Sequence, residues 1–137
     1  MDKTHLEFSL YPNLFPIEVH VCYSADDKRS FDFFKKKAKE PKLNIDSRKG
    51  DASTWRFRKH IFIEISPDMG REPSLLAAIV AHEAVHASWF AEQIVGNMFN
   101  EDAQETQCYF VQYLTEQITR NIWDSIRKKV KKKHARR

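Results

Sequence analysis

Cysteine is scarce in this sequence, and the two residues present, Cys22 and Cys108, are too few and too far apart for a disulfide framework. Because Cys22 falls within an alternating strand pattern, we expect both to be reduced, buried thiols of an intracellular protein. The N-terminus lacks long apolar runs, since charged residues and prolines interrupt them before signal-peptide or membrane length. We therefore expect a cytoplasmic protein with no membrane partner.

Positive charge is concentrated at the C-terminus. Residues 127–137 contain eight Lys and Arg and no acid, so subtracting them from the net charge of +4 leaves −4 for the remaining chain. We interpret this run as a solvated helix end, with contact to nucleic acid or an acidic partner as the alternative. No aromatic residue interleaves with it, which weakens the nucleic-acid alternative. By length, residues 1–126 form one domain, followed by the basic tail at 127–137.

Hydrophobic periodicity predicts four strands and three helices. The strands are expected at residues 5–10, 17–23, 54–58 and 61–65. The helices are expected at residues 28–39, 74–95 and 101–129. The strand at 17–23 alternates as a half-buried strand does. Strands with one helix, followed by two helices, indicate an α+β domain with a small, mostly antiparallel sheet packed on helices.

The helix at 74–95 contains the most specific chemical pattern, the run from His82 to His86, HEAVH. Histidines four positions apart lie on the same helix face, so both imidazoles can bind one metal ion. Glu83 points about 100° away round the helix, which keeps it out of the ligand set but near a water on the metal. That position suits a general base. The sequence therefore predicts one zinc ion per chain, bound by His82 and His86.

The spacing also predicts the surroundings of the two histidines. Their helix face is otherwise mostly apolar, with Leu75, Ile79, Trp89 and Gln93. We expect this stripe to face inward, where an unpaired imidazole costs free energy that a metal removes. The alternative is an ordinary pair of core or surface histidines. A second stripe of small residues, expected to let the last helix or the sheet approach closely, consists of Ala77, Ala81, Ala84 and Ser88.

Two histidines leave a zinc site short of its usual three protein ligands. No histidine follows His86 until His134, so we expect a carboxylate. The acids considered are Glu92, Glu101, Asp102, Glu105 and Glu116. Glu105 is best placed, one turn into the final helix, with a plain exposed glutamate as its alternative. Glu101 and Asp102 are instead candidates to accept the outer N–H of a zinc-bound imidazole.

The run HEAVHASWF, followed by ETQCYFVQYL beginning nineteen residues after His86, resembles the gluzincin pattern of zinc metallopeptidases. The chain is also similar to minigluzincin-like and compact phage- or prophage-encoded metallopeptidase-like proteins, over about residues 60–115. This resemblance implies that His82, His86 and Glu105 are the zinc ligands and that Glu83 is the general base. It also implies a substrate-pairing strand that consists of Ile61, Phe62, Ile63, Glu64 and Ile65.

The residue that stabilises the oxyanion is not specified by spacing. The separate His or Tyr of large thermolysin-like enzymes has no clear counterpart, and the candidates are Tyr109, Tyr113 and His60, with core packing as the alternative role. The expected function is zinc-dependent hydrolysis of a peptide or protein substrate. Its alternative is a zinc-binding structural or accessory protein, for example of a phage, with little or no turnover.

Overall fold

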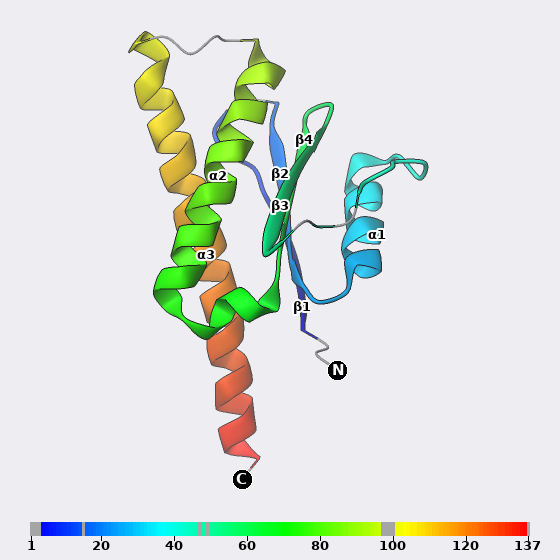
Figure 1. Cartoon of the computed structure of the whole chain (residues 1–137), viewed down its shortest axis with the longest axis vertical. Helices are drawn as coiled ribbons and strands as arrows, with labels where there is room; N and C mark the ends of the chain where they lie inside the picture. Colours follow the sequence, from blue (N-terminus) through cyan, green and yellow to red (C-terminus); the bar gives the residue numbers. More distant parts are fainter. Residues whose placement is uncertain (1–3, 15, 47, 49, 97–100, 137) are drawn as a thin grey trace.

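The computed structural model describes residues 4–14, 16–46, 48, 50–96 and 101–136. These residues form a four-stranded mixed sheet with three α-helices, which confirms the predicted α+β class (Figure 1). The strands are β1 (His5–Leu10), β2 (Glu18–Ser24), β3 (Ala52–Phe57) and β4 (His60–Ile65). The helices are α1 (Asp27–Ala38), α2 (Pro73–Val95) and α3 (Gln104–Ala135), with 3₁₀ turns η1 (Pro67–Arg71) and η2 (Glu101–Ala103).

The order of strands in the sheet is β1-β2-β4-β3. The central pair β2–β4 is parallel and the two outer pairs are antiparallel. Because β4 is hydrogen-bonded to a strand on each side, an extended peptide cannot add to it. The expectation that a substrate lies along Ile61–Ile65 is therefore wrong. The edge strand on this side of the sheet is β3, which contacts α2.

Helices cover both faces of the sheet (Figure 1). On one face, residues such as Val21 and Ile63 pack with α2 and α3 in the main core. On the other face, Cys22 and Phe62 pack with Phe34 of α1. As a result, the last six residues of β2 and all of β4 are buried. The expectation of a half-buried second strand is wrong, because α1 covers the face that its alternation would leave to solvent.

Helix α2 packs through a stripe of small and aliphatic residues, which also contains one glutamate. Its buried positions are Leu76, Val80, Glu83, Ala84, Ala87, Ser88 and Ala91. Helices α2 and α3 lie side by side and antiparallel, and the Gln107 side-chain amide donates to Ser88 Oγ at 3.2 Å (Figure 1). This arrangement confirms the expected close approach at Ala84 and Ser88, whereas Ala77 and Ala81 of the predicted stripe are only half-buried.

The helix face that contains His82 and His86 points away from the core. Both imidazoles are exposed, and Leu75 and Trp89 on the same face are 41% and 53% exposed. The expectation of an inward-facing stripe is wrong for Leu75, His82, His86 and Trp89, because α2 buries a neighbouring stripe against the sheet and α3 instead. That stripe consists of Leu76, Val80, Ala84, Ala87 and Ala91, and Ile79 is half-buried beside it. The pair therefore lies at the surface of the folded chain.

Helix α2 also has the length and apolar composition of a membrane span, with 23 residues and a mean hydropathy of 1.2 in its most apolar window. One such helix is weak support for a membrane protein, because the core helix of a soluble protein passes the same test. Here the buried stripe of α2 packs on the sheet and α3. The cytoplasmic location and the lack of a membrane partner stay predictions.

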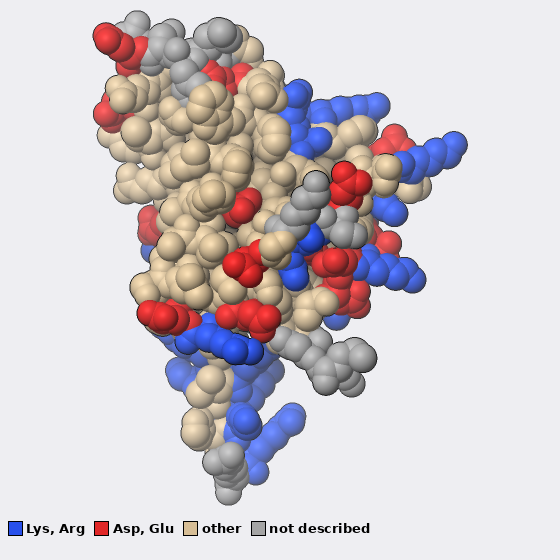
Figure 2. All heavy atoms as spheres, in the orientation of Figure 1, with Lys and Arg blue, Asp and Glu red and all other residues tan. Residues whose placement is uncertain are grey.

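Helix α3 continues through the basic tail to Ala135, past the end of the sheet (Figure 1). All of residues 127–136 are exposed. Figure 2 shows Lys and Arg gathered at this end of the molecule. Contact of the tail with nucleic acid or an acidic partner stays a prediction.

The two cysteines are free and differ in environment. Cys22 is fully buried, and burial raises the pKa of its thiol. Cys108 lies on the exposed side of α3, so the expectation that both thiols are buried is wrong for this residue. The reason is that α3 buries the stripe of Phe110, Leu114, Ile118 and Ile122, from which Cys108 points away.

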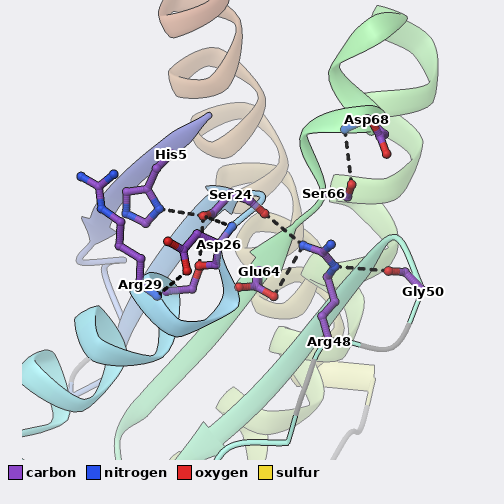
Figure 3. Close-up of polar contacts among 10 residues, drawn as sticks. His5, Ser24, Asp26, Arg29, Arg48, Gly50, Glu64, Ser66 and Asp68 are labelled. Atoms are coloured by element: carbon purple, nitrogen blue, oxygen red, sulfur yellow. Dashed lines mark hydrogen bonds and ion pairs between the residues drawn. The ribbon is translucent and has the colours of Figure 1, made fainter. Parts of the chain in front are cut away.

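Glu64 is a buried carboxylate on the α1 side of β4. Its side chain is 0% exposed, and among the described residues neither oxygen has a hydrogen-bond partner. Its nearest cation is Arg48, with Nη1 3.5 Å from Oε1, and Arg48 also donates to the Ser24 carbonyl at 3.1 Å (Figure 3). Burial is the main cause that raises the pKa of Glu64 to about 7, with a further contribution from the Asp27 carboxylate.

Replacing this carboxylate is expected to stabilise the fold at alkaline pH. Because the folded-state pKa lies above the unfolded value, the contribution of Glu64 to stability is present at low pH and is lost as the pH rises through about 7. Glu64→Gln should therefore raise the free energy of unfolding by roughly 1–3 kcal/mol at pH 8 and by less at pH 5. Urea denaturation at both pH values measures this difference. An exposed control, Glu116→Gln, should change stability by less than about 0.5 kcal/mol at either pH. A Glu64→Gln protein no more stable than the wild type at pH 8 contradicts the prediction.

Candidate functional site

His82 and His86 converge on one point beside α2. Their Nε2 atoms are 3.2 Å apart and their ring planes are inclined at 67°. In a tetrahedral zinc site with Zn–N bonds of about 2.0–2.1 Å, neighbouring ligand atoms lie about 3.3 Å apart. The two nitrogens are therefore spaced as ligands of one zinc ion. The same distance also suits one hydrogen bond between neutral imidazoles, so spacing is only part of the case.

Glu83 lies between the histidine pair and the sheet. Its side chain points toward β3, where the hydroxyl of Thr54 donates a hydrogen bond to Oε2. The residue is 5% exposed, although both histidines beside it are exposed. The carboxylate expected to act as a general base is thus held in place by a neighbouring strand.

A pocket of about 300 Å³ lies between the motif helix and the edge of the sheet. His82, Glu83 and His86 line it from α2. The opposite wall comes from β3 and the loop before it, and consists of Asp46, Ala52, Ser53, Thr54 and Trp55. Two imidazoles, a buried carboxylate and an exposed carboxylate therefore share one pocket.

The expected third ligand, Glu105, lies in the first turn of α3 and is exposed. Among the described residues, the groups of three or more potential ligand atoms within 4.8 Å of one another do not include the histidine pair, so Glu105 does not complete it here. Helix α3 contacts α2 at Ser88, which is two residues after His86 and so about 200° round the helix. Glu105 stays a predicted ligand. Asp46 supplies the pocket with a carboxylate that is not part of the HExxH motif.

Of the remaining candidates, those whose side chains the structure describes do not line the pocket. Glu101 and Tyr109 are exposed, and the side chain of Asp102 is not among those that the structure describes. Tyr113 packs against the main core. His60 lies on the face of the sheet that α1 covers, whereas α2 packs on the opposite face. The expectation that His60 stabilises the oxyanion is therefore wrong.

Thr54 and Asp46 were not predicted from the sequence as residues of the site. Thr54 was expected in a strand, but its contact with Glu83 depends on β3 being the edge strand beside α2, which periodicity does not specify. Asp46 belongs to a loop with no recognisable spacing from the motif.

The described residues fit a catalytic zinc ion in part. They supply two imidazole ligands at the correct separation and a carboxylate that is buried beside them without belonging to the pair. A zinc ion with an open coordination position is typically held by three protein ligands, of which this structure brings together two. Comparisons of the chain with protein-family models, curated proteins and solved structures found no match, so the resemblance to gluzincins rests on the sequence motif and stays a prediction.

Proposed function

We propose that this protein is a zinc-dependent metallopeptidase whose active site is the pocket between α2 and β3. The observation that carries the proposal is the pair of Nε2 atoms 3.2 Å apart beside the buried, hydrogen-bonded carboxylate of Glu83. In this role His82 and His86 hold the metal. A zinc ion bound there lowers the pKa of a water molecule and polarises the carbonyl group to be attacked.

Glu83 performs the proton transfers. Its Oε2 accepts the hydrogen bond from Thr54, which fixes the orientation of the carboxylate and leaves Oε1 as the atom that we assign to take the proton of the attacking water. The same group then delivers this proton to the leaving amine. A zinc site that only stabilises a fold needs no additional carboxylate that lies beside the metal without binding it. The presence of Glu83 therefore favours catalysis.

Strand β3 is the element best placed to hold a peptide. It is the edge strand of the sheet and lines the pocket through Ala52, Ser53, Thr54 and Trp55. Its backbone N–H and C=O groups that point away from β4 can pair with an extended chain. This assignment transfers the substrate-binding role expected for residues 61–65 to the edge strand of the described sheet.

The second candidate is a zinc-binding structural or accessory protein, such as one from a phage, with little turnover. The exposed position of Glu105, apart from the two histidines, favours it. The experiment that separates the candidates compares zinc-loaded wild-type protein and Glu83→Gln on a library of internally quenched peptides. Cleavage by the wild type alone supports the peptidase. Bound zinc without cleavage by either supports the second candidate.

The hydrogen bond from Thr54 is expected to contribute to turnover. Thr54→Val keeps the shape of the side chain and removes its donor, so kcat should fall about tenfold while zinc content stays unchanged. Thr54→Ser keeps the hydroxyl and should retain most of the activity. The measurement is kcat on an internally quenched peptide cleaved by the wild type. If the Val and Ser variants have the same kcat, Thr54 does not position Glu83.

A further inference from the structure

We infer that the protein has a second site for a transition-metal ion, formed by Glu18, His20 and His60 on the sheet face covered by α1. Glu18 and His20 are two positions apart in β2, so their side chains project from the same face. His60 is the first residue of β4 and is paired with Glu18 in the parallel register. Because α2 packs on the opposite face, this cluster is distinct from the pocket of the HExxH motif.

The three potential ligand atoms are spaced as metal ligands. His60 Nδ1 lies 3.0 Å from His20 Nε2 and 3.3 Å from Glu18 Oε2. All three atoms lie within 4.8 Å of one another. The edge of a tetrahedral zinc site is about 3.3 Å, which is close to both short distances. Two imidazoles and one carboxylate also form a ligand set that suits Zn²⁺ or Co²⁺ better than Ca²⁺ or Mg²⁺.

Hydrogen bonds and one ion pair link this cluster in the absence of a metal. Ser9 Oγ lies 2.8 Å from His20 Nδ1, at the outer side of that ring. A neutral imidazole carries one N–H, and a carboxylate oxygen only accepts. Neutral rings whose protons do not face each other therefore place at most one ring proton among Glu18 Oε2, His60 Nδ1 and His20 Nε2, and the Lys59 ammonium supplies the other donor, to Glu18 Oε2. A divalent cation binds all three lone pairs at once.

The surroundings also suit a metal site. His20 is 1% exposed and His60 is 7% exposed. The ring of His20 packs against Phe33 and Phe62, which hold it in place. The Glu18 side chain, 23% exposed, gives an ion access from solvent.

Lys59 opposes metal binding at this site. Its Nζ lies 3.1 Å from Glu18 Oε2, the same oxygen that faces His60, and its side chain is 50% exposed. A cation that binds Glu18 must displace this ammonium group and overcome its repulsion. Removing the charge should therefore strengthen metal binding, an effect that damage to the fold cannot imitate.

The test uses the full chain with His82→Ala and His86→Ala, so that the motif site is removed. Titration calorimetry with Zn²⁺ and the visible absorption of bound Co²⁺ measure binding. We expect one zinc ion per chain in this background, about tenfold or weaker affinity after adding Glu18→Gln, and a several-fold gain after adding Lys59→Gln. Lys28→Gln, which removes an exposed charge elsewhere, is the matched control and should leave the affinity unchanged.

Two results overturn the inference, provided that circular dichroism shows each variant folded. One is a background protein that binds no zinc. The other is zinc binding that neither Glu18→Gln weakens nor Lys59→Gln strengthens. Either outcome leaves Glu18, His20 and His60 as a hydrogen-bonded group. The peptidase proposal is tested separately, by changes at His82 and Glu83 in a chain with the second cluster intact, so the two can fail independently.

Discussion

Glu83→Gln is expected to lower kcat for peptide cleavage by about 10²–10⁴-fold and to leave the zinc content unchanged. Glutamine has the size of glutamate and keeps an oxygen that can accept the hydrogen bond from Thr54. Its amide cannot take a proton from water, so only the proton transfer is removed. Steady-state cleavage of an internally quenched peptide, together with elemental analysis of the purified protein, measures both quantities.

A matched control for this variant lies on the same helix. Glu92→Gln makes the same chemical change two and a half turns later, at a residue that does not line the pocket, and should leave kcat close to that of the wild type. Equal activity of the Glu83→Gln and Glu92→Gln proteins would exclude Glu83 as the general base. Loss of zinc from the Glu83→Gln protein would instead indicate that the Glu83 carboxylate is a zinc ligand.

Replacing either histidine of the motif should remove about one zinc ion per chain and abolish peptide cleavage. Each imidazole supplies one of the two ligand atoms that lie 3.2 Å apart, and the remaining one cannot hold the ion alone. The variants are His82→Ala and His86→Ala, and the measurement is zinc content relative to the wild type after dialysis.

The control for zinc binding is His134→Ala, which removes an exposed histidine from the basic end of α3. This protein should keep the zinc content and the activity of the wild type. Both motif variants lie on the exposed face of α2, so neither creates a cavity in the core. Unchanged zinc content in folded His82→Ala and His86→Ala proteins would rule out a metal at the motif.

The secondary structure was accessible from the sequence because its signals are local. The alternation at 61–65 and the apolar spacing at 74–95 identified β4 and α2 to within one residue at each end. The order of strands was not accessible, since it depends on pairing between distant segments. For this reason β4 was taken for a substrate-binding edge, although it lies between β2 and β3.

The burial of α2 was mispredicted for a related reason. Periodicity identifies which residues share a helix face, but which face packs depends on the shape of the neighbouring elements. Here the small side chains of Ala84, Ala87 and Ala91 allow close packing on the sheet and α3, while Trp89 stays exposed. The motif identified His82, Glu83 and His86 as one chemical unit, but not the wall that completes their pocket.

The second cluster has a sequence signal that was overlooked. Glu18 and His20 are two positions apart in a strand, and His60 begins another strand, so one sheet face can collect all three. The pairing of β2 with β4, which brings them together, joins residues 42 positions apart in sequence and is fixed only by the fold. Local patterns of this kind become informative once the sheet order is known.

Anomalous X-ray scattering at the zinc edge, from crystals of the zinc-loaded protein, tests the central claim most directly. We predict a zinc peak within about 2.0–2.1 Å of Nε2 of both His82 and His86, with the Glu83 carboxylate beside the ion but outside its ligand set. The same map identifies the third ligand and decides between Glu105 and Asp46. A zinc-loaded crystal with no anomalous peak between the two imidazoles would contradict the claim.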